Sequence, residues 1–360
     1  MRLLIITRND SPDHASFRQR ILVHLDALRA AGIECNVVRL PRGIWDRRRL
    51  FASARRYDAV LLHRKLLNAS DEFWMRRFDV KVVFEIDDAM MYSDRKPFET
   101  SRIRFGRLRR TMRRSELVIA GNTYLAEHAQ RYGVPTEVLP TGLDLEPYRV
   151  EPPQRDDETI RLVWIGSGST LVYLREIRPA LEELGRRWPH IVLRIICSDF
   201  LDLDSMQVEK KTWSRDTEAI DLMTSDIGLA PLPDNPFTRG KCGFKILQYQ
   251  AAGLPVVASP VGVNAEYVRD GVTGCLVRNH REWVEAISGL IEDSDRRKAM
   301  GQAGRRDVEA FDVHTLSNRF YALIAGYIES NRGPAGTVRP GDEPPARQEH
   351  DLARETSPTD

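Results

Sequence analysis

The chain has 360 residues, of which 42% are hydrophobic and 29% charged, a composition typical of a globular protein long enough to form two domains. It contains no apolar run of the length that spans a bilayer, which excludes a helical membrane protein, and we expect no signal peptide, because the apolar N-terminal stretch is short and Asp10 follows it. A net charge of +2 favours no class of partner by itself. The four cysteines are too scattered for a metal site, and we expect reduced thiols in a cytoplasmic protein.

The first part of the chain alternates short apolar runs with helical patterns. A helix is predicted from Phe17 to Ala31, between the first two runs. Strands alternating with helices predict βαβ units and a parallel sheet covered on both faces. The predicted strands are residues 2–8, 34–40, 58–63, 81–86 and 116–120.

The same alternation restarts after a stretch rich in proline and charge, PTGLDLEPYRVEPPQRDDE, which is typical of a linker between domains. A helix is predicted from Thr170 to Arg187, after the first strand of this second series. Two successive α/β sheets of similar size predict two Rossmann-like domains that face each other across a cleft. The predicted strands are residues 160–166, 191–197, 226–232, 254–259 and 274–277.

The C-terminal end departs from this pattern. Residues 281–330 have a helical pattern, whereas residues 331–360 contain five prolines and almost no large apolar side chains, which predicts a disordered tail. The sequence therefore divides into a domain at 1–145, a linker at 146–158, a second domain at 159–311, a helix at 312–330 and a tail at 331–360.

Two segments of the second domain resemble a known family. Residues 226–277, DIGLAPLPDNPFTRGKCGFKILQYQAAGLPVVASPVGVNAEYVRDGVTGCLV, are similar to the donor-binding region of GT-B glycosyltransferases of family 4, and WIGSGST (164–170) is similar to their glycine-containing loop. The resemblance covers the second domain and extends to the first in layout only. It implies a nucleotide-sugar donor in the second domain, an acceptor in the first, retention of anomeric configuration, no required metal, and a C-terminal helix that returns to the first domain.

Two lysines are the candidates for stabilising the leaving diphosphate. Lys241, Lys245 and Gln248 follow at i, i+4 and i+7, so we expect them on one stripe of a helix, with Gly240 just before it. Fixed positive charge can replace a metal ion at a departing diphosphate. The alternative is that both lysines only solvate a surface helix. A branch of the family carries Lys-x3-Lys-x2-Glu/Gln, which these residues fit.

Many family members have a Glu-x7-Glu pair in this register, whose second glutamate binds the donor ribose. In this chain the two positions fall on Gly240 and Gln248, so the pair is missing. An amide forms a weaker hydrogen bond to a ribose hydroxyl than a carboxylate does. Gln248 is therefore the expected donor contact.

Two further segments of the second domain are candidates for contact with the donor. The loop of Gly166, Ser167, Gly168 and Ser169 follows a strand and precedes a helix, where backbone N–H groups can face a phosphate; the alternative is a simple turn. Asn264 and Glu266 follow the SPVG turn, and capping of the next helix by Asn264 is the alternative there.

The first domain offers two carboxylates and two basic residues. The strand KVVFEIDD ends in Asp87 and Asp88, at the edge of a parallel sheet where ligands bind. Many relatives have a histidine at about this place. We expect Asp87 or Asp88 to bind a sugar or to take the acceptor proton, the alternatives being a helix cap and a two-carboxylate metal site. His14 and Arg18, in the loop after the first strand, are the candidates for a second anion contact.

One stretch of the first domain is strongly basic. RIRFGRLRRTMRR (102–114) has seven arginines, no acidic residue and several interleaved apolar residues, and DRRRLFASARR (46–56) adds more. Such a face suits an anionic membrane surface and a lipid-linked acceptor, or it is an ordinary solvated helix. Nucleic acid is not the expected partner, because no reading motif or aromatic platform accompanies the charge.

The resemblance and the residues together predict an enzyme. We expect a retaining hexosyltransferase-like glycosyltransferase of polysaccharide biosynthesis that moves a sugar from a UDP- or GDP-sugar to a glycan or lipid-linked hydroxyl acceptor without a metal or other cofactor. The expected location is the cytoplasm, with peripheral association with a membrane. The alternatives are a nucleotide-sugar epimerase of the same fold and a non-catalytic module that binds a nucleotide sugar.

Overall fold

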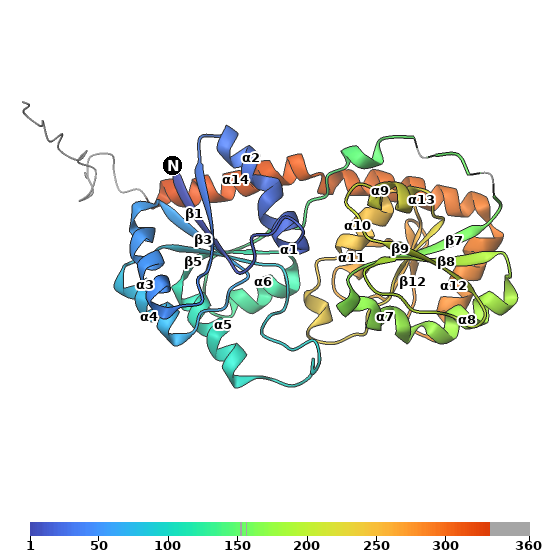
Figure 1. The fold of residues 1–360 in the computed structure, drawn as a ribbon, viewed down its shortest axis with the longest axis horizontal. Helices are drawn as coiled ribbons and strands as arrows, with labels where there is room; N and C mark the ends of the chain where they lie inside the picture. The colour runs from blue at the N-terminus through green and yellow to red at the C-terminus, as the bar shows by residue number, and fades with distance from the viewer. Residues whose placement is uncertain (152, 156, 332–360) are drawn as a thin grey trace, which may run out of the picture.

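Two parallel six-stranded sheets make up the core of the computed structural model, which describes residues 1–151, 153–155 and 157–331. The predicted disorder of the C-terminal tail lies, apart from residue 331, outside the described residues. In spatial order, the first sheet consists of β2 (Glu34–Arg39), β1 (Arg2–Thr7), β3 (Ala59–His63), β4 (Val82–Ile86), β5 (Ser115–Ala120) and β6 (Thr136–Val138). The second consists of β12 (Gly274–Leu276), β11 (Val256–Ala258), β10 (Ile227–Ala230), β7 (Ile160–Ile165), β8 (Ile191–Cys197) and β9 (Gln207–Thr212). Figure 1 shows the two sheets side by side along the length of the molecule.

Helices cover both faces of the first sheet, because strand residues alternate between two apolar clusters. One face packs on α3 (Ile44–Ser53), α4 (Ala69–Arg77), α5 (Arg102–Arg114) and α6 (Thr123–Gln130). The other face packs on α1 (Ala15–Phe17), a π-helical turn at Arg18–Leu22, α2 (Val23–Ala30) and α14 (Val313–Ser330). The predicted helix from Phe17 to Ala31 is therefore present, with a π-turn at its start.

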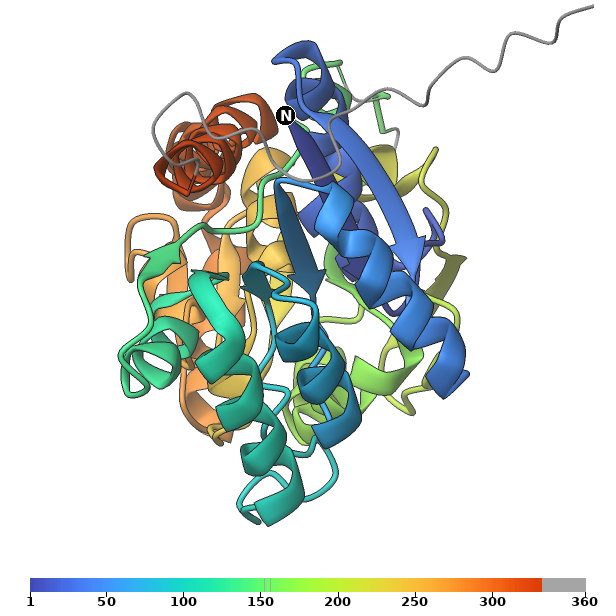
Figure 2. The same cartoon turned by 90° about the vertical axis from the view of Figure 1, so that its left-hand side faces the viewer.

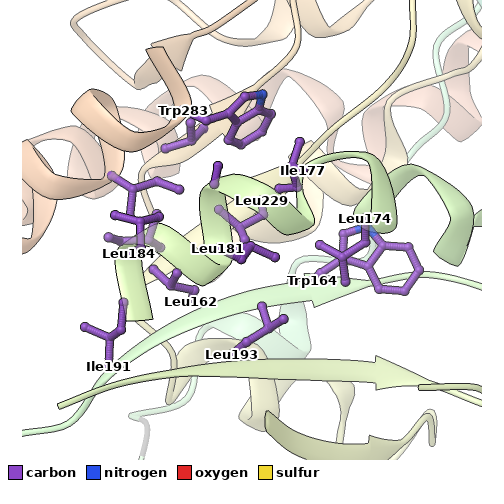
Figure 3. Close-up of a cluster of buried hydrophobic side chains, with 14 of the residues drawn as sticks. Leu162, Trp164, Leu174, Ile177, Leu181, Leu184, Ile191, Leu193, Leu229 and Trp283 are labelled. Carbon is purple, nitrogen blue, oxygen red and sulfur yellow. The ribbon is translucent and has the colours of Figure 1, made fainter. Parts of the chain in front are cut away.

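The second sheet is covered in the same way. The cluster in Figure 3, which includes Trp164, Leu181 and Trp283, packs one face against α7 (Leu171–Glu176), α8 (Arg178–Arg187) and α12 (His280–Glu292). The other face packs on α9 (Glu218–Met223), α10 (Phe244–Ala251) and α13 (Ser294–Val308), with α11 (Asn264–Tyr267) beside α10. The predicted helix 170–187 is divided at Ile177, where Pro179 starts a new helix.

Two crossings of the chain join the domains, and they are hydrogen-bonded to each other. Leu143 N donates to Phe311 O and Val313 N donates to Leu143 O, each at 3.0 Å. Beyond this point α14 packs on α2 and adds Leu316, Phe320 and Ile324 to the core of the first sheet. In Figure 1 this red helix lies along the blue α2. None of the helices in the described residues combines the length and apolar character needed to cross a membrane.

Candidate functional site

A cavity of about 480 Å³ lies between the domains and is lined by residues of both. The first domain contributes the loop and turn after β1 and the end of β4; the second contributes the loop after β7 and the start of α10. These are carboxyl ends of parallel strands, the edge at which open α/β sheets bind ligands. Lys241 and Lys245 both line this cavity rather than facing open solvent away from it.

Lys245 lies in the first turn of α10 and is held over an aromatic ring. Its Nζ is 4.5 Å from the ring centroid of Trp164, a fully buried residue of β7. Burial, and secondarily the nearby charge of Lys241, lower the pKa of Lys245 to about 7. The start of this helix depends on Gly243, which has a left-handed backbone with φ of 63°. A Cβ at this position would also lie 2.7 Å from the side chain of Val263 and 3.0 Å from that of Tyr267. Lys245 therefore loses its proton more readily than an ordinary lysine, and an anion in the cavity would favour its charged form.

The expectation that Lys241 lies on the same helical stripe is wrong. The helix begins at Phe244, because Gly243 has a left-handed backbone, and Lys241 lies in the preceding loop with an extended backbone. The side chain nevertheless reaches the cavity, where Nζ is 3.4 Å from Asp88 Oδ1 and 4.7 Å from the ring centroid of Phe237. Lys241 thus connects the two domains by an ion pair.

The loop before α10 also packs closely on the first domain. Asn122 caps α6 by accepting from Leu125 N, and its Nδ2 donates to Lys241 O at 3.1 Å. A Cβ on Gly240 would lie 2.5 Å from the Cβ of Ala89. The position of the missing first glutamate is thus filled by the opposite domain, which excludes a side chain there.

Gln248 contacts a carboxylate that sequence reasoning missed. Gln248 is buried in the cavity wall, where its side chain lies beside those of Tyr148 and Glu218. Glu218 begins α9, accepts from Trp213 Nε1 at 2.6 Å and has its pKa raised by burial. No motif surrounds Glu218 in the sequence, and only the packing of α9 beside α10 brings it to Gln248.

The glycine-containing loop lies at the cavity wall in part. Gly166 and Ser167 line the cavity, whereas Gly168 and Ser169 begin a 3-10 turn outside the lining. The N–H of Gly166 donates to Ile196 O, and that of Ser167 donates to Thr170 Oγ1. A Cβ on Gly166 would lie 2.5 Å from the ring of Trp164, so this glycine allows the loop to cover the ring beneath Lys245.

Asn264 and Glu266 differ in their placement. Asn264 is buried at the cavity wall, with Nδ2 at 3.4 Å from Ala230 O, and its side chain does not cap α11, where Val263 is the N-cap residue. Glu266 is exposed, lies outside the lining of the cavity and accepts from Thr123 Oγ1 of the first domain at 3.2 Å.

Asp87 and Asp88 lie in the cavity and share one guanidinium group. Arg64 Nε is 3.0 Å from Asp87 Oδ1, and Arg64 Nη2 is 2.5 Å from Asp88 Oδ2. Ser16 donates to Asp87 Oδ2 at 2.6 Å. Neither side chain acts as the predicted alternative of a helix cap. Within the described residues there is also no cluster of His, Cys, Asp and Glu suited to a metal ion.

A buried ionic network fixes the end of β4 below these carboxylates. Glu85 accepts from Arg20 Nε at 2.7 Å and contacts His63 Nδ1 at 2.5 Å. Burial alone would raise the pKa of Glu85, but the charges of Arg20 and His63 hold it below its usual value. Because a buried charge is costly without its partner, these contacts fix the backbone from which Asp87 and Asp88 project.

His14 and Arg18 lie on opposite sides of the α1 region. Arg18 lines the cavity and reaches the second domain, where its guanidinium is 5.0 Å from the ring centroid of Trp213. His14 lies outside this lining and borders a second cavity of the first domain. Burial, then the charges of Arg64 and His63, lower the pKa of His14. The two residues therefore do not form one anion site.

Comparison with known proteins finds similarity in the segment of the second domain that contains Lys241 and Lys245. Residues 207–293 match the family described as glycosyl transferases group 1. D-inositol 3-phosphate glycosyltransferase of Nocardia farcinica is 35% identical over 97 residues, which are 26% of this chain and 22% of the relative. The enzyme of that name from Arthrobacter sp. is 33% identical over 100 residues, 26% of this chain and 24% of the relative. The aligned segment thus spans less than a quarter of the length of each of these relatives.

Solved structures resemble the whole two-domain arrangement. Anabaena HepE in complex with UDP and glucose has a TM-score of 0.69 at 17% identity, covering 91% of this chain and 100% of that one. Sucrose-phosphate synthase of Thermosynechococcus elongatus has a TM-score of 0.69 at 15% identity, covering 91% and 99%. The fold is GT-B, and residues 207–293 are similar to the group 1 glycosyl transferases.

The match to the group 1 glycosyl transferases includes most of the donor-side residues described above. Glu218, Lys241, Lys245, Gln248 and Asn264 all lie within residues 207–293. The loop at 166–169 and the first-domain carboxylates lie outside that match and are placed by the GT-B fold alone.

Proposed function

We propose that this chain is a retaining glycosyltransferase that moves a sugar from a UDP-sugar to a hydroxyl acceptor without a metal ion. The observation that carries the proposal is the amine of Lys245, which is desolvated over Trp164 in a cavity between two GT-B domains. Solved neighbours of this fold contain UDP or UDP-glucose, which favours uridine over guanosine in the donor.

Donor binding in this proposal relies on charge already present in the cavity. The diphosphate lies against Lys245 and Lys241, and the ribose hydroxyls donate to Glu218 beside Gln248. Glu218 then supplies from α9 the carboxylate that Gln248 lacks. Asn264 and the loop at Gly166 and Ser167 complete the donor side of the cavity.

In the transfer step, the bond between the sugar anomeric carbon and the diphosphate oxygen breaks, and its electron pair leaves with the diphosphate. The acceptor oxygen forms the new bond on the same face, and its proton passes to Asp88 or to the departing diphosphate. Lys245 stabilises the negative charge as it develops on the leaving oxygen, which is the role that a divalent ion has in metal-dependent transferases. Ion pairing of Asp88 with Arg64 and Lys241 orients its oxygens.

Transfer is tested with purified protein, EDTA, and UDP-, GDP- and dTDP-sugars with hydroxyl acceptors. We expect UDP release that depends on an acceptor, and a product that keeps the donor's anomeric configuration by NMR. Lys245→Met should lower turnover by about 100-fold to 1,000-fold, the usual cost of removing one group that stabilises a developing charge. Lys298→Met, which changes an exposed lysine of α13, is the control. Epimer formation without UDP release, or binding without turnover, would contradict the proposal.

A further inference from the structure

A second cavity, of about 820 Å³, lies in the first domain next to the one between the domains. It is lined by the loops that follow β1, β2, β3 and β4 and by the first half of α5. Asp88 lines both cavities, and Phe237 closes the second one from the opposite domain. A molecule in this cavity therefore reaches the same carboxylate that contacts Lys241.

The second cavity is strongly basic. Eight of its lining residues are arginine or lysine, and two are aspartate. Part of this charge is neutralised: Arg47 and Lys65 pair with Asp71, and Arg64 pairs with Asp87 and Asp88. Burial lowers the pKa of Lys65 despite its contact with Asp71, and the charge of Arg47 contributes to this lowering.

Five lining arginines remain. Arg104 donates to the backbone oxygens of Met90 and Tyr92, and the other four are not neutralised. Arg8 follows β1, Arg39 ends β2, Arg42 lies in the next loop and Arg107 lies on α5. Within the part of the chain that the structure describes, none of these four forms an ion pair. A concave site with several unpaired guanidinium groups favours a dianionic ligand, and guanidinium matches the oxygens of a phosphate in two-point hydrogen bonds.

We infer that the second cavity binds the acceptor through a phosphate group. This inference rests on the proposed glycosyl transfer and names its acceptor class: a hydroxyl compound that carries a phosphate monoester, diester or diphosphate. The phosphate contacts Arg39, Arg107 and their basic neighbours, while the hydroxyl to be glycosylated lies at Asp88, where the two cavities meet. The arginines then fix the orientation of the acceptor, and Asp88 contacts the oxygen that reacts.

The phosphate can belong to a soluble molecule or to a lipid, and the surroundings of the cavity favour a lipid. Exposed Ile44 and Trp45 adjoin Arg42 in the sequence, and exposed Phe98 and Ile103 precede Arg104, another lining residue. Figure 2 shows α3, α4 and α5, which carry most of these residues, side by side on one face of the first sheet. Exposed apolar side chains on the elements that carry a basic site are suited to a phosphate held at a membrane surface.

Binding is tested in full-length protein with the donor cavity saturated by UDP, so that an added phosphate cannot occupy it. Glycerol 3-phosphate is titrated by calorimetry and compared with glycerol, which has the same hydroxyls without the charge. We expect glycerol 3-phosphate to bind, with an affinity that falls as salt is added, and glycerol not to bind at the same concentrations.

The double variant Arg39→Gln/Arg107→Gln should weaken this binding by about tenfold or more, because charge-assisted hydrogen bonds are lost. The matched control is Arg109→Gln/Arg131→Gln, which removes two exposed arginines of the same domain that line neither cavity. The control should bind glycerol 3-phosphate like the parent, and both double variants should keep the parent's affinity for UDP.

A second arm distinguishes the sources of phosphate. A flotation experiment compares phosphatidylcholine vesicles with and without a polyprenyl phosphate. The source is a lipid if only the vesicles that contain polyprenyl phosphate retain the protein, and if this retention is lost in Arg39→Gln/Arg107→Gln. Binding of glycerol 3-phosphate without such retention shows a soluble source. Equal binding of glycerol and glycerol 3-phosphate, or equal effects of the two double variants, overturns the inference. Failure to bind UDP, with phosphate binding intact, would instead overturn the proposed function.

Discussion

At the scale of single residues, we propose that Glu218 and Gln248 together bind the donor ribose. Gln248 stands at the position of the ribose-binding glutamate, and Glu218 brings a carboxylate to its amide from another helix. Trp213 donates to the same carboxylate at 2.6 Å and orients it. Because burial raises the pKa of Glu218, a ribose that donates hydrogen bonds to this carboxylate would favour its charged form.

Replacing Glu218 by glutamine therefore has a specific expected result. The parent protein should bind UDP more tightly than 2′-deoxy-UDP, and Glu218→Gln should weaken UDP binding by about tenfold to 100-fold, the usual worth of a charged hydrogen bond. The variant should lose most of the preference for the 2′-hydroxyl. Calorimetric titration of both nucleotides measures this, with Glu292→Gln, an exposed residue at the end of α12, as the control. An unchanged preference in Glu218→Gln would show that the ribose lies elsewhere.

At the scale of elements, the loop before α10 carries the contact between the domains. Gly240 packs on Ala89, Asn122 holds Lys241 O, and Cys242 Sγ contacts Asp87 O at 3.0 Å. This loop thus fixes Lys241 and the start of α10 against the carboxyl edge of the first sheet. The close approach at Gly240 leaves no space for a Cβ.

Gly240→Ala should therefore act on closure as well as on stability. We expect a loss of about 1–3 kcal/mol in the free energy of unfolding, typical of overpacking, and lower turnover because the domains cannot approach fully. The control is Gly326→Ala in α14, where an added Cβ meets nothing within 4 Å and should be neutral or stabilising by up to about 1 kcal/mol. Urea unfolding and turnover measure both variants. Wild-type turnover in Gly240→Ala would contradict the proposed role of this contact.

The sequence was sufficient to predict most elements of the fold, and the exceptions have physical reasons. The ten predicted strands are all present. Most are apolar runs buried on both faces, whereas the edge strand β2 has only exposed and half-buried residues and was recognised from its short apolar run. The strands β6 and β9 were not predicted: both are edge strands, and β9, QVEKKT, has no apolar run. The break between α7 and α8 arises because Pro179 lies in the first turn of α8, and the helical pattern of the sequence did not indicate this break.

The residues of the candidate site could be predicted only where they lie close together in the sequence. Lys241, Lys245 and Gln248 were recognised from their spacing, although Gly243 places Lys241 in a loop. Glu218 could not be recognised, because its contact with Gln248 arises from the packing of two helices that are distant in sequence. The second cavity was likewise hidden, since its free arginines come from separate loops and one helix.

At the scale of the whole molecule, two domains joined by two adjacent crossings enclose the cavity that contains Lys245. The crossings at Leu143 and Val313 are hydrogen-bonded together, so we expect them to form the hinge if the domains close on a ligand. Closure places Lys245 and Lys241 from one domain opposite Asp88 from the other. Removing water from such a site strengthens each charge interaction within it.

We expect Lys245 to become positively charged as it binds the diphosphate. Its pKa of about 7 in the free protein means that it is largely neutral at pH 8 and charged at pH 6. An anionic ligand raises that pKa, so the complex binds more protons than the free protein at pH 8, and UDP affinity falls as pH rises above about 7. At pH 8 the phosphates of UDP are already fully ionised, so the proton taken up belongs to the protein.

Calorimetric titration of UDP at pH 8, in EDTA and in buffers of different ionisation enthalpy, measures this uptake directly. We expect UDP to bind without a metal ion and with the uptake of about one proton per UDP, and we expect this uptake to disappear in Lys245→Met together with much of the affinity. Binding that requires Mg²⁺, or an uptake that is the same in Lys245→Met, would contradict this expectation.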